Sequence, residues 1–217
     1  MKLLKRLRHR LAILMAAVVD PGTFRIAYKS FCANQTLQKP LELFRCIRWL
    51  KKQGLRNVME IGSWQGGTLY VWSQISAKDA NLISLDLNRV GDNGELVKRF
   101  HSLVQSSQHL VCLRQDSHLP TSLEATKMAL DGRKLDFLFI DGDHTYEGVK
   151  QDFEMYGPLV KSGGFVAFHD ITDNPEVPVY GVAKFWRELR EKFEHVEFID
   201  HISPINGCGI GILRLPT

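Results

Sequence analysis

The stretch from Leu135 to Ile171 reads LDFLFIDGDHTYEGVKQDFEMYGPLVKSGGFVAFHDI. Its two apolar runs, 135–140 and 164–168, have the length of buried strands, and a segment with helical spacing separates them. In an open parallel α/β sheet, ligands bind outside the carboxyl ends of the strands. We therefore predict one polar site at that edge of the sheet, formed by Asp141, Asp143, His144, His169 and Asp170.

Strands and helices alternate along most of the chain, which predicts βαβ units and a mainly parallel α/β sheet with helices on both faces. The segment 201–209 is too short for a helical crossover, so we expect the last strand to insert antiparallel. The division that we expect is an N-terminal helical extension over residues 1–56 and a catalytic domain over 57–217. Seven strands are predicted, at 57–61, 82–86, 110–115, 135–140, 164–168, 196–199 and 210–215.

The composition is that of a globular protein, with 217 residues, 44% of them hydrophobic and 24% charged. The net charge is +4, and the first ten residues carry five basic side chains. Without those five, 23 basic residues face 24 acidic ones, which argues against a nucleic-acid-binding face on the main domain. The cysteines have no metal-like spacing and indicate free thiols in a reducing compartment: Cys32, Cys46, Cys112 and Cys208.

The N-terminal segment has the pattern of an amphipathic helix. Its apolar part is too short to span a bilayer, and no clear cleavage site precedes Asp20. Two interpretations stay open: the helix packs on its own domain or on a second subunit, or its basic face attaches to anionic lipid. We therefore expect a cytoplasmic protein with possible peripheral contact at the inner membrane surface. The apolar positions are Leu4, Leu7, Leu11, Leu14 and Val18.

A glycine loop, EIGSWQGG at residues 60–67, follows the first strand and opens a helix. A loop in that position admits the close approach of a ligand. Asp86 ends the next strand, where a carboxylate can accept hydrogen bonds from ribose hydroxyls. Glu60 would repel a pyrophosphate but suits an ammonium or sulfonium group. The loop therefore favours S-adenosylmethionine over a dinucleotide.

With these motifs, the sequence resembles a class I S-adenosylmethionine-dependent methyltransferase over roughly residues 57–215. The segments IDGDHTYEGV, FHD and GVAKFWREL resemble a bacterial group of small methyltransferases related to cephalosporin-hydroxylase-like and macrocin O-methyltransferase-like enzymes. The resemblance implies a Rossmann-like fold and O-methylation of a hydroxyl on a small sugar or natural-product acceptor.

The resemblance also implies a cofactor site. It assigns Asp86 to the ribose and Asp116 with Ser117 to the neighbourhood of the adenine. The alternative for Ser117, or for Thr121, is a helix cap. The methionine part of the cofactor would lie among Glu60, Gly62, Ser63 and Gly66.

The implied reaction needs a base and can use a divalent cation, magnesium or a transition metal. Metal-dependent catechol-type relatives carry an Asp that Asp141 matches, and a lysine where this chain has His144, which we expect to be the general base. Asp141, His169 and Asp170 are the candidate metal ligands. His169 stands where those relatives carry Asp, so a metal-free site, in which Asp141 and Asp170 orient the two histidines, stays open.

Two other functions remain possible from the sequence. One is a non-catalytic cofactor-binding module that acts through a partner, and the other is an NAD-dependent oxidoreductase, which the glycine spacing disfavours. The short N-terminal leucine seam allows a homo-oligomer, and no nucleic-acid partner is expected.

Overall fold

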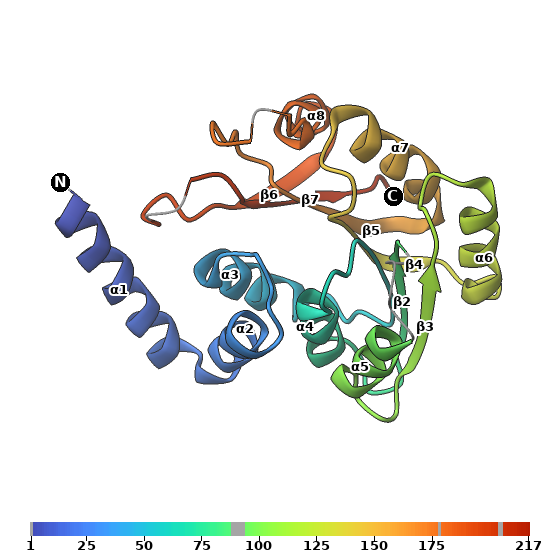
Figure 1. Cartoon of the computed structure of the whole chain (residues 1–217), viewed down its shortest axis with the longest axis horizontal. Coiled ribbons are helices and arrows are strands. Elements are labelled where there is room, and N and C mark those ends of the chain that lie inside the picture. The colour runs from blue at the N-terminus through green and yellow to red at the C-terminus, as the bar shows by residue number, and fades with distance from the viewer. Residues whose placement is uncertain (1, 88–93, 178, 204–205) are drawn as a thin grey trace.

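The computed structural model describes residues 2–87, 94–177, 179–203 and 206–217. They form a seven-stranded sheet in the order β3-β2-β1-β4-β5-β7-β6, with helices packed on both faces (Figure 1). The strands are β1 (Asn57–Ile61), β2 (Asn81–Asp86), β3 (His109–Arg114), β4 (Leu135–Ile140), β5 (Val160–His169), β6 (Glu194–Phe198) and β7 (Ile210–Arg214).

Strands β1 to β5 pair in parallel, and β7 runs antiparallel between β5 and β6. This arrangement confirms the predicted Rossmann-like, mainly parallel sheet with an antiparallel last strand. Because β1 to β5 are parallel, their carboxyl ends all meet at one edge of the sheet.

Helices α2 to α5 lie on one side of the sheet, and α6 to α8 lie on the other (Figure 1). A short 3-10 helix, η1 (Gly157–Leu159), joins α7 to β5. The helices are α1 (Lys2–Val19), α2 (Pro21–Ala33), α3 (Pro40–Leu50), α4 (Gly67–Ile75), α5 (Glu95–Leu103), α6 (Pro120–Leu130), α7 (Tyr146–Tyr156) and α8 (Val182–Arg190). The charged and apolar stretch before the third strand predicts a helix from about residue 93 to residue 106; residue 93 lies outside the described residues, and α5 ends at Leu103.

Two apolar cores form because successive side chains of a strand point to opposite faces of the sheet. On β4, Phe137 and Phe139 belong to the core under α3 and α4, whereas Leu138 and Ile140 belong to the core under α7 and α8. Trp72 of α4 contacts both phenylalanine rings at centroid distances of 5.0 Å. The fully buried β4 therefore holds its carboxyl end, and the polar residues that follow it, in a fixed place.

The dipeptide Pro21-Gly22 is typical of a loop, and from it the sequence predicts an irregular stretch; the chain after Pro21 is instead helical. Asp20 caps α2 by accepting a hydrogen bond from the Thr23 amide at 3.0 Å, and Pro21 takes the first helical position, where its missing N–H costs nothing. Strand β5 is also longer than predicted: residues 160–163 belong to it, and the register shifts between them and Phe165.

Helix α1 packs on the rest of the protein through Ala12, Ile13 and Ala16. The helix thus packs on its own domain, one of the two interpretations left open by the sequence, but the face that packs is not the predicted apolar seam. Its described members are exposed: Leu7 by 54%, Leu11 by 53%, Leu14 by 62% and Val18 by 77%. Among the described residues, no helix is long and apolar enough to cross a membrane.

The boundary between an extension and a catalytic domain at residue 56 stays a prediction. Ala27 of α2 and Leu43 of α3 lie in the same apolar core as Trp72 of α4. The segment 34–39 between α2 and α3 continues to the carboxyl edge of the sheet, where Gln38 contacts Asp141.

Candidate active site

A cavity of about 720 Å³ opens at the carboxyl edge of the parallel strands. Its walls come from the ends of β1 to β5, from residues 35–38 of the N-terminal part and from Cys208 in the loop between β6 and β7. The volume lies within the range of ligand-binding pockets, on the order of 300–1,000 Å³. The predicted polar edge of the sheet is therefore a cavity that can hold a ligand.

Gly62 begins the glycine loop between β1 and α4, and no other residue fits there. Its φ is +86°, and a Cβ atom on it would lie 2.0 Å from the Asp141 carbonyl oxygen. The close approach of the two loops brings Gly62 and Ser63 into the cavity wall. Gly66, at φ +83°, caps α4 and packs against Phe100 instead of lining the cavity.

Glu60 lies behind the glycine loop and does not line the cavity. Its side chain is buried, with the residue 1% exposed, and Oε1 accepts a hydrogen bond of 2.9 Å from the Trp72 indole. Oε2 has no hydrogen-bond partner among the described residues. Burial raises the pKa of Glu60 to about 7. A role for Glu60 in binding the cofactor stays a prediction.

Asp86 lines the cavity at the end of β2. Its carboxylate accepts a hydrogen bond of 2.6 Å from the Trp64 amide and lies 3.8 Å from the Arg114 guanidinium. Asp116 and Ser117 line the cavity at the end of β3, as predicted. Asp116 accepts a hydrogen bond from the following His118 amide at 2.9 Å.

The capping alternative for the end of β3 is wrong. Leu119 is the N-cap residue of α6, and no side-chain hydrogen bond caps that helix. Neither Ser117 nor Thr121 therefore serves as its cap. Ser117 instead accepts a hydrogen bond of 2.7 Å through its carbonyl from the Tyr156 hydroxyl, which fixes the loop above α7.

Four of the predicted residues meet at the ends of β4 and β5. His169 Nδ1 lies 3.2 Å from Asp141 Oδ1 and 3.6 Å from Asp170 Oδ1. His144 Nδ1 lies 3.2 Å from Asp170 Oδ2. Two carboxylates thus alternate with two imidazoles, so each imidazole can donate to a carboxylate.

The charges of this cluster shift the pKa values of its members. Burial alone would lower the pKa of His144, but the hydrogen bond with Asp170 and the charge of Asp141 raise it above its ordinary value. Burial opposes protonation of His169 as well, yet the charge of Asp141 holds the pKa of His169 well above the ordinary value. Both imidazoles therefore bind a proton more readily than a free imidazole does, because the neighbouring carboxylates favour the charged form.

The neighbours of His144 fix its ring without making it a helix cap. Thr145 caps α7 by accepting a hydrogen bond of 3.0 Å from the Gly148 amide. Asp143 is a turn residue, whose Oδ1 accepts from the Thr145 amide at 2.8 Å. The imidazole of His144 stacks on the Tyr180 ring at a centroid distance of 4.5 Å.

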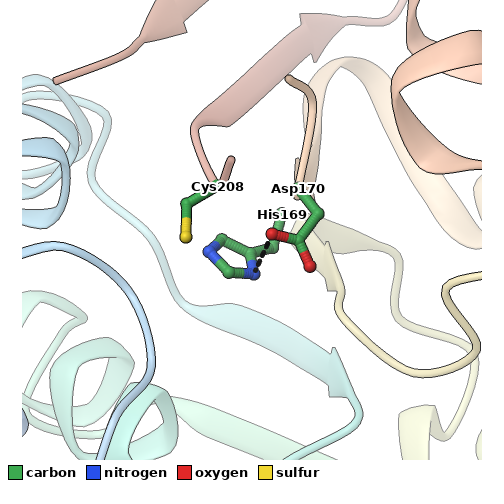
Figure 2. Close-up of side chains that lie close together, drawn as sticks. All are labelled: His169, Asp170 and Cys208. Carbon is green, nitrogen blue, oxygen red and sulfur yellow. Dashed lines mark ion pairs between the residues drawn. The ribbon is translucent and has the colours of Figure 1, made fainter. Parts of the chain in front are cut away.

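Sequence reasoning did not assign two residues that the fold adds to the site. Gln38 donates a hydrogen bond of 2.7 Å from its side-chain amide to Asp141 Oδ2. Cys208 lies beside His169 and Asp170 (Figure 2). The only available sequence signal for Cys208 was its place between two glycines, Gly207 and Gly209.

Backbone strain gathers around the cavity. Five non-glycine residues have a positive φ among those that the structure describes, and four of them line the cavity: Gln35, Trp64, Asp170 and Cys208. Conformations of this kind cost about 1–3 kcal/mol each and cluster at functional sites. The strain supports the assignment of this cavity as the functional site.

One curated relative matches part of the chain. A curated protein of Acanthamoeba polyphaga mimivirus is 32% identical over 119 residues, which are 53% of this chain and 51% of that protein. The matched stretch thus spans about half the length of that relative.

Two solved structures share the fold. One is the O-methyltransferase TomG of Streptomyces achromogenes, involved in tomaymycin synthesis and solved with S-adenosylmethionine, with a TM-score of 0.61, 15% identity and 90% of both chains covered. The other is the methyltransferase MycE of the mycinamycin biosynthetic pathway, solved with Mg, S-adenosylhomocysteine and mycinamycin VI. It has a TM-score of 0.58 and 14% identity, and the match covers 89% of this chain and 54% of MycE.

A family model described as a methyltransferase domain matches residues 59–171, from the first strand through the end of β5. This region contains the glycine loop, Asp86, Asp141, His144, His169 and Asp170, and it makes up more than half of the sequence. The chain therefore belongs to the methyltransferase domain family, and it shares its fold with the S-adenosylmethionine-binding O-methyltransferase TomG.

Proposed function

We propose that this protein is an O-methyltransferase that transfers the methyl group of S-adenosylmethionine to a hydroxyl of a small sugar or natural-product acceptor. The observation that carries the proposal is one cavity that holds both the glycine loop and a histidine hydrogen-bonded to a carboxylate. TomG and MycE, which share the fold, act in natural-product pathways, and this supports the acceptor class. The narrower resemblance to macrocin O-methyltransferase-like enzymes is part of the same proposal.

The residues around the cavity fit the cofactor. Gly62 lets the strand-to-helix turn lie directly against the Asp141 backbone, where a side chain would collide, and the turn forms part of the cavity wall. Ser63 lies beside Gly62 in the cavity wall, where the methionine part would bind. Asp86 offers a carboxylate to the ribose hydroxyls, and Asp116 lies at the end of the cavity assigned to the adenine.

In the proposed role, Glu60 acts from behind the loop. Its carboxyl group is buried, and its pKa of about 7 leaves it close to half ionised at neutral pH. A cation bound in front of the loop would favour the ionised form. Glu60 would thereby contribute attraction for the ammonium or sulfonium group without a direct hydrogen bond.

When bound, S-adenosylmethionine supplies an electrophilic methyl group on a sulfonium. The cofactor would supply the methyl carbon to the acceptor oxygen and keep the electron pair of the broken carbon–sulfur bond, and His144 would take the hydroxyl proton. Asp170 holds Nδ1 of His144 at 3.2 Å, which leaves Nε2 to accept that proton. Stacking on Tyr180 limits rotation of the ring, so the base is oriented before the acceptor binds.

We also propose that a divalent cation assists the reaction. When bound, such an ion lowers the pKa of the acceptor hydroxyl. Asp141 and Asp170 offer the oxygen ligands that magnesium, present in the MycE structure, prefers. The third predicted ligand, His169, offers nitrogen instead, so the site does not match an all-oxygen magnesium site.

Residues from two segments would form the acceptor side of the cavity. Asn174, Val177 and Tyr180 follow β5, and Gln35 and Leu37 come from the segment between α2 and α3. The mixture of amide, apolar and aromatic side chains suits a partly hydroxylated acceptor better than a charged one.

Partners other than the acceptor stay predictions. The exposed leucines of α1 support contact with a second copy or with lipid, and the exposed Arg6, Arg8 and Arg10 would favour an anionic membrane surface. A cytoplasmic protein with peripheral contact at the inner membrane surface is consistent with this face. Sedimentation with anionic and with neutral vesicles tests it, since equal binding to both would remove the role of the arginines.

The test of the proposed function is turnover on hydroxylated acceptors. The protein is incubated with S-adenosylmethionine and a panel of monosaccharides, glycosides and polyhydroxylated natural products. Mass spectrometry detects the added methyl group, and NMR locates it on oxygen. We expect His144→Ala to reduce kcat by about 10²–10⁴-fold and to keep the affinity for S-adenosylhomocysteine.

The matched control is His109→Ala, since His109 is exposed at the start of β3, at the opposite edge of the sheet. Wild-type turnover in His144→Ala would remove His144 from the mechanism. A methyl group found on nitrogen or carbon of every accepted substrate would contradict O-methylation.

A further inference from the structure

The loop after β3 meets helix α7 at the end of the cavity that the proposed function assigns to the adenine. His118 of this loop lines the cavity, and its side chain is 24% exposed. Asp152 of α7 lies behind the cavity wall, with its side chain 0% exposed. The reaction as proposed uses neither residue.

Helix α7 holds His118 by its backbone and by its ring. The Gln151 side-chain amide donates a hydrogen bond of 3.3 Å to the His118 carbonyl. The Nε2 atom of the His118 ring lies 3.3 Å from the Gly148 carbonyl oxygen and 3.4 Å from Asp152 Oδ1. The ring is therefore held with Nε2 toward α7 before a ligand binds.

These neighbours determine which ring nitrogen of His118 carries the proton. A carbonyl and an ionised carboxylate only accept hydrogen bonds, so Nε2 must be the donor. In the neutral ring, Nδ1 is then an acceptor. It lies 3.9 Å from Asp116 Oδ1, which is too far for a hydrogen bond. Nδ1 is thus the ring atom that can accept a hydrogen bond from a ligand.

The buried acid behind the ring supports this orientation. Neither carboxylate oxygen of Asp152 makes a hydrogen bond of normal geometry within the described part of the chain. Burial raises the pKa of Asp152 to about 6, so the group is ionised at pH 8. A buried charge is costly unless a polar group faces it, and here the Nε2 side of His118 does so. The charge of Asp152 therefore favours the form of His118 that is protonated at Nε2.

The adenine end of the cavity presents mainly acceptors to a ligand. Asp116 and Asp143 line it with carboxylates, beside the Nδ1 atom of His118. Such a wall fits a ligand edge that carries N–H donors. Adenine has this donor in its exocyclic amino group, whereas hypoxanthine carries a carbonyl oxygen at the same position.

We propose that His118 Nδ1 accepts a hydrogen bond from the exocyclic amino group of the cofactor's adenine, and that Asp152 is the positioning residue that holds the ring for this contact. The inference deepens the proposed function and rests on it, because it names a residue that selects the base of the cofactor. A ligand with a carbonyl oxygen in place of the amino group would set two acceptors against each other, and a site of this kind rejects such a ligand.

The experiment compares two ligands of the full-length protein by calorimetry at pH 8: S-adenosylhomocysteine and S-inosylhomocysteine, in which a carbonyl oxygen replaces the amino group. We expect the wild type to prefer S-adenosylhomocysteine by at least about tenfold. His118→Phe keeps a ring without nitrogen and should reduce this preference by at least about fivefold, and Asp152→Asn, which removes the charge, by at least about threefold. His109→Phe is the matched control, since His109 is exposed at the start of β3.

Nitrogen NMR of the histidine rings gives a second readout on the wild-type protein. In the complex with S-adenosylhomocysteine at pH 8, we expect the proton of His118 on Nε2 and none on Nδ1. The His118→Phe spectrum assigns the signals.

Three results would overturn the inference. They are equal affinity of the wild type for the two ligands, a proton on Nδ1 of His118 in the complex, and a wild-type preference in His118→Phe, as a merely structural role would give. The first two do not depend on the folding of a variant. An unchanged preference in Asp152→Asn would overturn the positioning role of Asp152. A wild-type protein that binds neither ligand would overturn the proposed cofactor site and this inference with it, so the two failures are distinguishable.

Discussion

Replacing Glu60 by glutamine removes an acid that the fold buries behind the glycine loop. Burial raises its pKa from an ordinary 4.5 to about 7. A protein whose folded state holds a proton more tightly than its unfolded state loses stability as the pH rises. For Glu60 this loss begins near the unfolded pKa of 4.5 and is complete above the folded pKa of about 7.

The size of this loss of stability follows from the pKa shift of Glu60. Each pKa unit corresponds to about 1.4 kcal/mol, so the full penalty at alkaline pH is on the order of 3 kcal/mol. Glutamine keeps the carbonyl that accepts from the Trp72 indole but carries no charge. We therefore expect Glu60→Gln to be close to wild type in unfolding free energy at pH 5 and more stable by about 2–3 kcal/mol at pH 8.

Urea unfolding of the two proteins at pH 5, 6, 7 and 8 measures this difference. Glu95→Gln is the control, because Glu95 is exposed on α5 and should show no pH-dependent gap. A gap between wild type and Glu60→Gln that does not grow with pH would refute the reasoning. It would mean that Glu60 stays solvated in the folded protein.

Two other substitutions test the cavity wall. Gly62→Ala should lower the unfolding free energy measured in urea by several kcal/mol, because its Cβ would lie 2.0 Å from the Asp141 carbonyl oxygen. The control is Gly132→Ala, at φ +75° with no atom within 4 Å of the added Cβ. It should lose only the ~1–2 kcal/mol that a left-handed conformation costs. Equal losses of unfolding free energy in the two variants would show that the loop after β1 does not lie against the loop after β4. Asp86→Asn should weaken S-adenosylhomocysteine binding about tenfold or more in calorimetry, since hydrogen bonds to a charged group contribute about 1.5–3 kcal/mol, while the exposed Asp79→Asn should leave it unchanged. Wild-type affinity in Asp86→Asn would exclude the ribose contact.

The sheet could be predicted from the sequence because its signal is local. Strand β4 is apolar at five of six positions and buried at all of them, and the polar residues follow directly at Asp141. The antiparallel last strand could also be predicted locally, because the connection before β7 is too short for a helical crossover. Helix α2 was missed although Asp20 and Pro21 are a good helix start, because the stretch was read as a loop after Pro21-Gly22.

The site was only partly accessible from the sequence. His169 and Asp170 are adjacent, and their position at a strand end was enough to predict them. Cys208 and Gln38 reach the same cavity by tertiary routes, one through the pairing of β7 with β5 and the other through the chain that leads from α2 to α3. No spacing rule connects such residues, so only the folded chain brings them together.

Calorimetric titration of the purified protein with S-adenosylhomocysteine, with NAD as the comparison ligand, tests the central claim most directly. The account predicts micromolar binding of S-adenosylhomocysteine and no binding of NAD, since the Gly62 turn and the buried Glu60 suit a cationic ligand without a pyrophosphate. Binding of NAD alone would contradict the proposed cofactor site.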